Sequence, residues 1–280
     1  MRTILLAVAL FFSFTAPAQF YYQDIVGSAE STTLMKNYLK NKVSRVVIRS
    51  YGAGNTANDD FYAEQQFNPA TRVLKTTTRA GRGFPSVLFS YADAEGRVIK
   101  TVDSSRILVS TTLYGYNEAG RLVSVSSSSI DSSGSLTNSE EHLWQWAADQ
   151  PSKMIRIRNR VDSSMIELTL DEKGNIAEEV EVRRKKRSQP VYYYYNDNNL
   201  LTDIVRYNQK AGRLLPETMF EYSAANQVIQ RITVPGTSGN YLIWRYQYNE
   251  AGLKTKEAIY SKDDKRTPIG RIEYQYSFGS

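Results

Sequence analysis

The stretch Tyr114-Gly115-Tyr116-Asn117-Glu118-Ala119-Gly120-Arg121-Leu122 contains the residues of a tight β-hairpin turn. Its two tyrosines are two positions apart, so they lie on one face of a strand. Asn117 begins the turn with a side chain that bonds the backbone two residues further on, and Gly120 takes a left-handed conformation without steric cost. Leu122 then restarts an apolar strand. The stretch predicts two antiparallel strands joined by a type I turn that ends in a left-handed residue.

The same pattern recurs along most of the chain at a spacing of about 26 residues, which is in the range of repeat arrays. A second family of turns lies between these copies and begins with Asp, Asn or Ser, as in Asp131-Ser132-Ser133-Gly134. Each period therefore holds two strands and two reversals of the chain. This arrangement predicts an antiparallel meander with one family of turns along each edge.

A long meander of this kind does not stay flat, because neighbouring strands rotate by about 20 to 25°. The sequence therefore predicts an all-β fold: an antiparallel β-hairpin repeat array that forms a coiled or spiralling meander sheet, with a short N-terminal helix. Residues 20–60 would hold the helix and the first strand, and residues 61–280 the repeats. Apolar positions near the turns would stack in rows on the concave face.

The N-terminal helix is predicted over residues 28–41, because Leu34, Met35, Tyr38 and Leu39 form a stripe at helical spacing. Ser28 or Ser31 would cap it. The segment from 43 to 50 is apolar and β-branched, so it reads as the first strand. We expect the helix to cover the open edge of that strand. The alternative is a helix that binds a partner.

Residues 1–19 have the features of a secretory signal peptide: Arg2, an apolar run from 4 to 14, and small residues at Ala16 and Ala18. The chain contains no Cys, so a lipoprotein anchor is not expected. No later stretch is long and apolar enough for a transmembrane helix. We therefore expect a periplasmic, outer-surface or secreted protein with no transmembrane segment after signal cleavage.

Composition narrows the range of partners and cofactors. The chain has 280 residues and a formal net charge of +6, with both signs interspersed. A charge this modest suits solubility rather than a dedicated polyanion, and the secreted address makes nucleic acid an unsuitable ligand. The expected partner is a glycan or another envelope component. No cofactor and no metal site are predicted, because a histidine-based site would depend on His142, the chain's single histidine.

The repeats resemble a known family. Residues 114–122 look like the YD repeat of Rhs-type proteins, whose consensus has Tyr-Asp before a short turn ending in Gly-Arg-Leu. Asn replaces the Asp at Asn117, Asn196 and Asn249, and Asp171 keeps it. The resemblance covers residues 61–280 and implies spiralling β-hairpins, which in large members form a hollow shell around a C-terminal toxin. This chain is too short for such a shell, so toxin delivery is not implied. The signal segment resembles those of small secreted Bacteroidetes proteins.

Aromatic residues supply the first set of candidate ligand-binding positions: Tyr193, Tyr195, Trp144 and Trp146, with Trp244 in the same aromatic set. On an exposed face such side chains could stack on sugar rings. On a buried face they would form a ladder across the repeats, since aromatic neighbours on adjacent strands stabilise a sheet. Their recurrence at equivalent repeat positions favours the ladder.

The densest run of charge supplies the second set of candidates: Arg183, Arg184, Lys185, Lys186 and Arg187. These cations could hold the phosphate or sulfate groups of lipopolysaccharide or of another polyanion. The alternative is a solvated reversal between two strands, with the nearby glutamates offsetting part of the field.

No catalytic residues are predicted. His142 is expected at the surface, and the adjacent carboxylates Asp59/Asp60, Glu178/Glu179 and Asp263/Asp264 lie in predicted turns or strand flanks. The sequence therefore predicts a secreted, non-enzymatic binding or structural module of the bacterial cell envelope. Two alternatives remain: an enzyme acting on envelope polysaccharide, which needs two converging carboxylates, and a carrier of lipid or another apolar ligand.

Overall fold

The computed structural model describes residues 20–234 and 240–279, so the predicted signal peptide lies outside the described residues. Within them the chain forms one long helix, a short 3-10 turn and a series of antiparallel strands. In chain order these elements are α1 (Gln23–Lys40), β1 (Val43–Gly52), η1 (Ala53–Asn55), β2 (Phe61–Asn68), β3 (Val73–Ala80), β4 (Ser86–Ala92), β5 (Val98–Ser104), β6 (Leu108–Tyr116), β7 (Leu122–Asp131), β8 (Leu136–Ala147), β9 (Gln150–Arg158), β10 (Asp162–Leu170), β11 (Ile176–Arg183), β12 (Lys186–Arg187), β13 (Val191–Tyr195), β14 (Leu201–Asn208), β15 (Arg213–Tyr222), β16 (Val228–Thr233), β17 (Leu242–Tyr248), β18 (Lys254–Ser261) and β19 (Gly270–Phe278).

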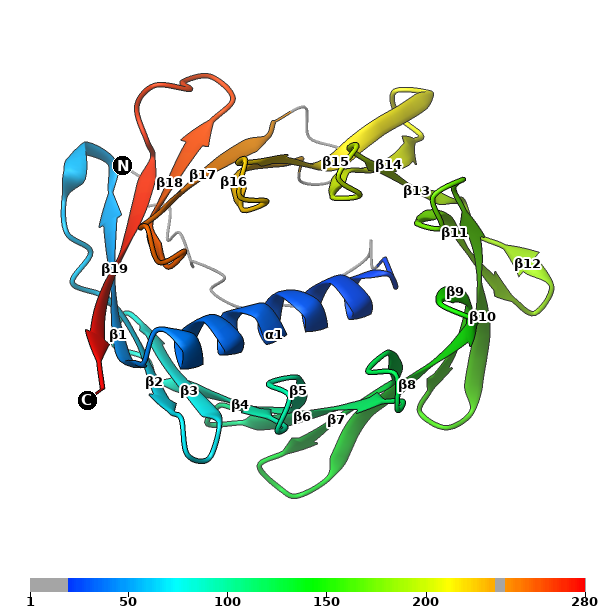
Figure 1. Ribbon diagram of the computed structural model, residues 1–280, viewed down its shortest axis with the longest axis horizontal. Helices are drawn as coiled ribbons and strands as arrows, with labels where there is room; N and C mark the ends of the chain where they lie inside the picture. The colour runs from blue at the N-terminus through cyan, green and yellow to red at the C-terminus, as the bar shows by residue number, and fades with distance from the viewer. Residues whose placement is uncertain (1–19, 235–239, 280) are drawn as a thin grey trace.

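The strands form one sheet that closes on itself (Figure 1). Successive strands pair along the chain, and β1 also pairs with β19, from Val43 opposite Phe278 to Gly52 opposite Gly270. The two-residue β12 pairs with β11, which itself pairs with β13, so the ring has 18 strands. The predicted coiled or spiralling meander is therefore wrong, although the all-β class is confirmed. Closure removes both sheet edges, whose N–H and C=O groups would otherwise need another cover.

Helix α1 lies inside this ring and crosses its lumen (Figure 1). It begins at Gln23 rather than at residue 28, and no side chain caps its start. Ser28, one of the predicted caps, instead lies within the helix and donates its hydroxyl to the carbonyl of Ile25. The expectation that the helix covers an open edge of β1 is wrong, because β1 is paired on both sides.

Seven turns between consecutive strands share one hydrogen-bonded geometry; six lie at one end of the barrel, and the seventh, at Asp131, lies at the other. In the turn at Asn117 the side-chain oxygen accepts a hydrogen bond from the backbone N–H of Arg121 at 2.9 Å, and Gly120 has a φ of 75°. This bond reaches four residues on, and the bond to the backbone two residues on that the sequence predicts forms in the equivalent turns at Asp171 and Asn196. The first residues of the six turns are Asp93, Asn117, Asp171, Asn196, Ser223 and Asn249.

Tyrosine hydroxyls tie neighbouring hairpins together just beside these turns. The phenol of Tyr116 donates to the carbonyl of Val98 at 2.9 Å, and the phenol of Tyr248 donates to the carbonyl of Val228 at the same distance. Tyr195, Tyr222 and Tyr276 make the equivalent bond one hairpin back. Each such bond satisfies a phenol that would otherwise be buried without a partner.

The strand register separates a lumen face from an outer face. Val46 packs against α1, so its direct partners Gln65 and Tyr276 also face the lumen, and residues two apart continue that face. The opposite positions face outward and include many charged side chains. Among them are Arg45, Arg49, Glu64, Lys75, Arg79, Lys100, Glu141, Lys153, Glu167, Glu178, Arg245, Lys256, Arg271 and Glu273.

The core forms where α1 meets the sheet, in two clusters. The C-terminal half of the helix buries Met35 and Tyr38 against residues of β1, β2 and β3. The N-terminal end places Tyr21 against residues of β7 to β14. In contrast, β15 and β16 contain no fully buried residue, and the one in β17, Ile243, faces outward. The helix therefore covers only part of the lumen face.

Candidate functional site

A cluster of charged side chains holds the start of α1 against the lumen face of β8 and β9. Asp24, in the first helical turn, accepts a hydrogen bond from the indole N–H of Trp144 at 3.0 Å. Its other contact is with Nδ1 of His142, at 2.6 Å, and Nε2 of His142 lies 2.9 Å from Glu140. Arg156 completes the group through a 2.9 Å contact with Glu140. We call these five residues the helix dock.

His142 is buried at the centre of the helix dock, so the expected surface position is wrong. Burial alone would lower the pKa of this imidazole, but the hydrogen bonds and charges of Asp24 and Glu140 raise it to about 9. The ring is therefore a cation at neutral pH and donates to a carboxylate on each side. The cluster joins the helix to the wall by charge as well as by packing.

A second carboxylate fixes the backbone just before the helix. Both oxygens of Glu179 accept hydrogen bonds from the N–H of Tyr21, at 2.9 and 3.1 Å, and one also accepts from the N–H of Tyr22 at 3.0 Å. Burial raises the pKa of Glu179, while the N–H groups of Tyr21 and Tyr22 act in the opposite direction. Backbone donors at the start of a helix are left without intrahelical partners, and Glu179 satisfies donors of that kind.

The opposite part of the lumen face has a different surface, which α1 does not cover. Six side chains there are partly exposed and combine aromatic rings with two cations; we call them the open wall. Its residues are Tyr222, Arg231, Trp244, Tyr246, Tyr248 and Lys254. The guanidinium of Arg231 lies 5.3 Å from the ring centre of Trp244, and the ammonium of Lys254 lies 4.6 Å from that of Tyr246.

Glu30 on α1 faces the open wall. Its side chain is exposed to solvent although the barrel surrounds it, so water reaches this part of the lumen. Burial within the ring raises the pKa of Glu30, and the positive charges of Arg231 and Lys254 oppose that rise. Nε of Arg231 is buried and makes no hydrogen bond within the described residues. The open wall thus presents stacking surfaces, two cations and an unused donor.

The predicted aromatic candidates all lie on the lumen side of the barrel. Tyr193 and Trp144 are buried, each with 3% of its surface exposed. Tyr195 donates to the carbonyl of Ile176 at 2.8 Å, and Trp146 donates to that of Leu122 at 2.8 Å. These contacts occupy the polar atoms of Tyr195 and Trp146 within the barrel. A role for these residues in ligand binding stays a prediction.

The predicted basic run lies at an exposed reversal on one rim of the barrel. Arg184 and Lys185 form the turn, with φ values of 49° and 66°. Arg183 pairs with Asp162 and Arg187 pairs with Glu167, while Lys186 is exposed in β12. The run does not meet the aromatic candidates, which face the lumen. Phosphate or sulfate binding by this run also stays a prediction.

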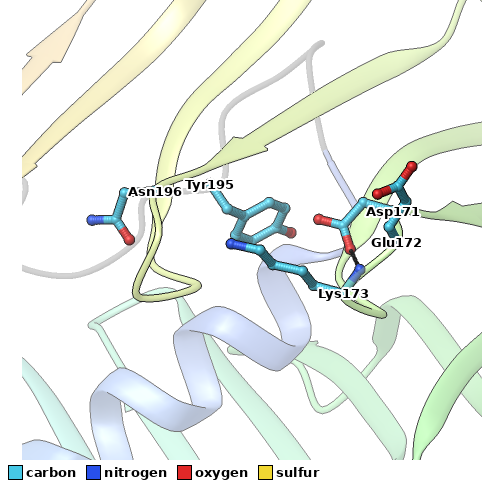
Figure 2. A pocket seen from close by; sticks show the side chains of 5 residues that line it. All are labelled: Asp171, Glu172, Lys173, Tyr195 and Asn196. Carbon is cyan, nitrogen blue, oxygen red and sulfur yellow. Dashed lines mark hydrogen bonds between the residues drawn. The ribbon is translucent and has the colours of Figure 1, made fainter.

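A shallow pocket of about 280 Å³ opens beside two turns of the opposite rim (Figure 2). Asp171, Glu172 and Lys173 come from one turn, and Tyr195 and Asn196 from the next hairpin. The carboxylate of Asp171 already accepts the backbone N–H of Lys173 at 2.9 Å. The pocket lies above the start of α1 in Figure 2, and its polar groups serve the turn itself.

The paired carboxylates named in the sequence do not converge. Glu178 pairs with Thr169 on the outer face and Glu179 with Leu168 on the lumen face. Asp59, Asp60, Asp263 and Asp264 are exposed in connections between strands. Asp24 and Glu140 do approach each other, but both are occupied by His142. Among the described residues, no group of three or more His, Asp or Glu side chains could hold a metal ion.

Sequence reasoning missed both the helix dock and most of the open wall. Asp24 lies before the predicted helix, and nothing local pairs it with His142, 118 residues away. Trp244 was within the aromatic set, but its partner Arg231 and the nearby Lys254, which contacts Tyr246, belong to no motif. The usable signal was the alternation along β17, where Trp244, Tyr246 and Tyr248 share one face.

Comparisons with known proteins reveal similarity of fold alone. No protein-family model matches the chain, and no curated protein matches it. A porin-like protein from Bacteroides uniformis aligns at 11% identity over 84% of this chain and 98% of its own length, with a TM-score of 0.37. The complex TcdB2-TccC3-Cdc42 aligns at 14% identity over 79% of this chain and 14% of its own, with a TM-score of 0.33. The Tc holotoxin pore of Photorhabdus luminescens gives a TM-score of 0.34 at 14% identity, over 81% of this chain and 14% of its own.

These values are too low to carry a functional argument, and the resemblance to YD repeats stays a prediction. Within the described part of the chain, no helix combines the length and apolar character that a membrane span requires.

Proposed function

We propose that this chain is a secreted, non-enzymatic binding protein of the bacterial cell envelope, and that its barrel takes an acidic oligosaccharide at the open wall. The observation that carries the proposal is the partly exposed, aromatic and cationic lumen face of β15 to β18. Aromatic rings provide flat surfaces for sugar rings, and Arg231 provides charge for carboxylate or sulfate groups, whereas Lys254 is already paired with Glu257 at 2.8 Å. Glu30 offers an acceptor for sugar hydroxyls.

The charged side chains on the outer face favour a barrel that is surrounded by water rather than by lipid. Side chains such as Arg49, Lys75 and Lys153 point away from the lumen, where a membrane barrel would present an apolar band. A charge facing lipid near the bilayer centre costs about 2 to 4 kcal/mol. The closed ring, the charged exterior and the predicted signal peptide together favour an envelope protein that is surrounded by water.

The absence of enzymatic activity is part of the proposal. Asp24 and Glu140 approach each other in the lumen, and both are bonded to a protonated His142. Neither is free to act as an acid or a nucleophile on a glycosidic bond, since that chemistry needs two available carboxyls on either side of the substrate.

Calorimetric titration of the mature protein with oligogalacturonate, an acidic sugar chain, and with maltohexaose, a neutral one, tests this function. We expect binding of the acidic chain alone. Trp244→Ala and Arg231→Gln should each weaken it about tenfold, equal to 1.4 kcal/mol. Arg245→Gln removes a neighbouring guanidinium from the outer face and serves as the matched control.

Equal binding by wild type, Arg231→Gln and Arg245→Gln would contradict the proposed site, as would no binding of either sugar. Shorter sugars found by mass spectrometry after incubation would contradict the non-enzymatic assignment. Lipid that co-purifies with the protein would instead favour the carrier.

A further inference from the structure

The connections between strands alternate between two rims of the barrel, because consecutive strands are antiparallel. The turn rim contains the six hydrogen-bonded turns described above. The hairpin rim, as we use the term, is the arc of the other rim that contains the connections β3–β4, β5–β6, β7–β8, β9–β10, β11–β12 and β14–β15. The connections β1–β2, β16–β17 and β18–β19 complete that rim. Outside the arc, β1–β2 and β18–β19 hold the exposed acids Asp59, Asp60, Asp263 and Asp264, together with Lys262, Lys265 and Arg266. In Figure 1 the hairpins spread outward from the ring, whereas the turns bend toward its centre. The two rims also differ in chemistry.

Large apolar side chains stand exposed at the tips of successive hairpins. Phe84 is 68% exposed, Ile107 is 70% exposed and Val161 is 87% exposed, each at the tip of a different hairpin. Leu136, the first residue of β8 after the β7–β8 connection, is 54% exposed. None of the large exposed hydrophobic residues belongs to the six turns of the turn rim. Apolar tips on four neighbouring hairpins of one rim mark a contact surface rather than scattered exposure.

Cations accompany the apolar tips. Arg106 lies over the ring of Phe84, with its guanidinium carbon 4.4 Å from the ring centre. The exposed cations of this rim are Arg82, Arg106, Arg160, Arg184, Lys185 and Lys210. The exposed charged residues near the tips of the turn rim are mostly acidic: Glu95, Glu118, Asp149, Glu172, Asp197 and Glu250. Asp131 does lie on the hairpin rim, but its carboxylate is bonded within its own turn to Ser133 and Ser135.

A pocket on the same rim adds a polar site between two of the apolar tips. It has a volume of about 300 Å³ and lies between the start of β8 and the β9–β10 connection. Arg160, Asn138 and Asn159 supply polar groups, and Leu136 supplies an apolar side. Asn159 accepts the backbone N–H of Ser139 at 2.9 Å, so the two strands hold the pocket in place. A cation among amides suits a phosphate group.

We propose that the hairpin rim docks on an anionic phospholipid surface. The barrel would stand on the membrane, with Phe84, Ile107 and Val161 entering the headgroup region and the cations facing lipid phosphates. The acidic turn rim would point away, because anionic lipid repels it. Exposed apolar residues flanked by Arg and Lys are the features that hold peripheral proteins at an anionic interface.

Flotation of the mature protein with vesicles tests this inference. The vesicles are pure phosphatidylcholine, or equal parts phosphatidylcholine and phosphatidylglycerol. We expect binding to the phosphatidylglycerol vesicles only, and weaker binding as salt rises. Arg106→Gln and Lys210→Gln should each lower the partition coefficient about fivefold, and Ile107→Ser combined with Val161→Ser should abolish flotation. Lys173→Gln removes a cation from the turn rim as the control and should change nothing.

All these residues are exposed, so circular dichroism of the variants should match that of the wild type. Failure of the wild type to float with anionic vesicles overturns the proposal, and so does an equal loss in Lys173→Gln. Retention on soluble polyphosphate without flotation would also overturn it, in favour of a free polyanion. The lumen residues of the proposed oligosaccharide site are not touched, so the two proposals fail independently.

Discussion

Two parts of the lumen face carry similar residues but have different surroundings. On β8, Trp144 is buried under the start of α1 and donates to Asp24. On β17, Trp244 stays partly exposed and lies beside Arg231. The sheet offers aromatic rings to the lumen on both sides, and the position of one helix decides which of them become core. The paired strands therefore form the barrel, whereas the helix decides which part of the lumen face stays exposed.

Replacing Trp144 and Trp244 separately by alanine should give the largest difference in stability between the covered and the open part of the lumen face. Trp144→Ala leaves a cavity in a packed cluster and removes a partner of Asp24, so we expect the free energy of unfolding to fall by about 3 to 5 kcal/mol. Trp244→Ala removes a partly exposed ring and should cost about 1 kcal/mol. Urea denaturation followed by circular dichroism measures both. Equal losses would show that the helix does not distinguish the two walls.

The helix dock should make stability depend on pH. The folded protein holds the proton of His142 with a pKa of about 9, whereas the unfolded chain has about 6.5. Protonated His142 therefore adds about 3 kcal/mol to the free energy of unfolding. This stabilisation is fully present below pH 6.5 and is lost as the pH rises through 9. Thermal unfolding at intervals across this range would reveal a falling Tm. In His142→Gln this fall should disappear, and overall stability should be lower because Asp24 loses its cation, whereas Glu140 keeps Arg156 and Arg158.

Tyrosine hydroxyls beside the turns should matter similarly on both walls. Tyr195→Phe removes a hydrogen bond to Ile176 on the covered side, and Tyr248→Phe removes one to Val228 on the open side. Each should lower stability by about 1 kcal/mol, since a carbonyl loses its donor in both cases. Urea titrations of the two variants provide the measurement. A loss confined to Tyr195→Phe would tie this bond to the presence of the helix.

The smallest expected effects concern the turns themselves. Gly120 and Gly252 both have a φ of 75°, and an alanine at either position would be strained. Gly120→Ala and Gly252→Ala should therefore each cost about 1 kcal/mol or slightly less, independent of the wall that they border. Differential scanning calorimetry of the pair gives the comparison. A difference between them well above this value would show that the helix also supports the turns.

Local chemistry was readable from the sequence where it repeats. The pattern around Asn117 and Gly120 predicted the reversal, and the spacing of tyrosines predicted which residues share a face. The closure of the sheet into a barrel could not be predicted, because neither β1 nor β19 has a sequence pattern that indicates their pairing. The same holds for the helix dock. Asp24 and His142 become partners only because the ring brings the helix start beside β8, so His142 was expected at the surface.

The candidate site, too, could be predicted from the sequence only in part. Aromatic residues of the lumen face were recognisable as a set, with Trp144 and Trp244 among them. Trp144 and Trp244 differ because α1 buries the first and not the second. The sequence predicted that this helix covers a strand edge, so it did not indicate which tryptophan would be buried. The cations Arg231 and Lys254 belong to no motif and gain meaning only from the register that places them beside Trp244 and Tyr246.

The seam between β1 and β19 has a consequence for how the molecule is made. There the hydroxyl of Ser44 donates to the carbonyl of Ser277, a residue 233 positions further along the chain. Contacts of such long range form slowly, because the intervening chain must first be ordered. Hairpins can assemble one after another as the polypeptide emerges, but the cylinder seals last. By then α1 must already be in place, since a sealed wall of hydrogen-bonded strands leaves an 18-residue helix no side entrance.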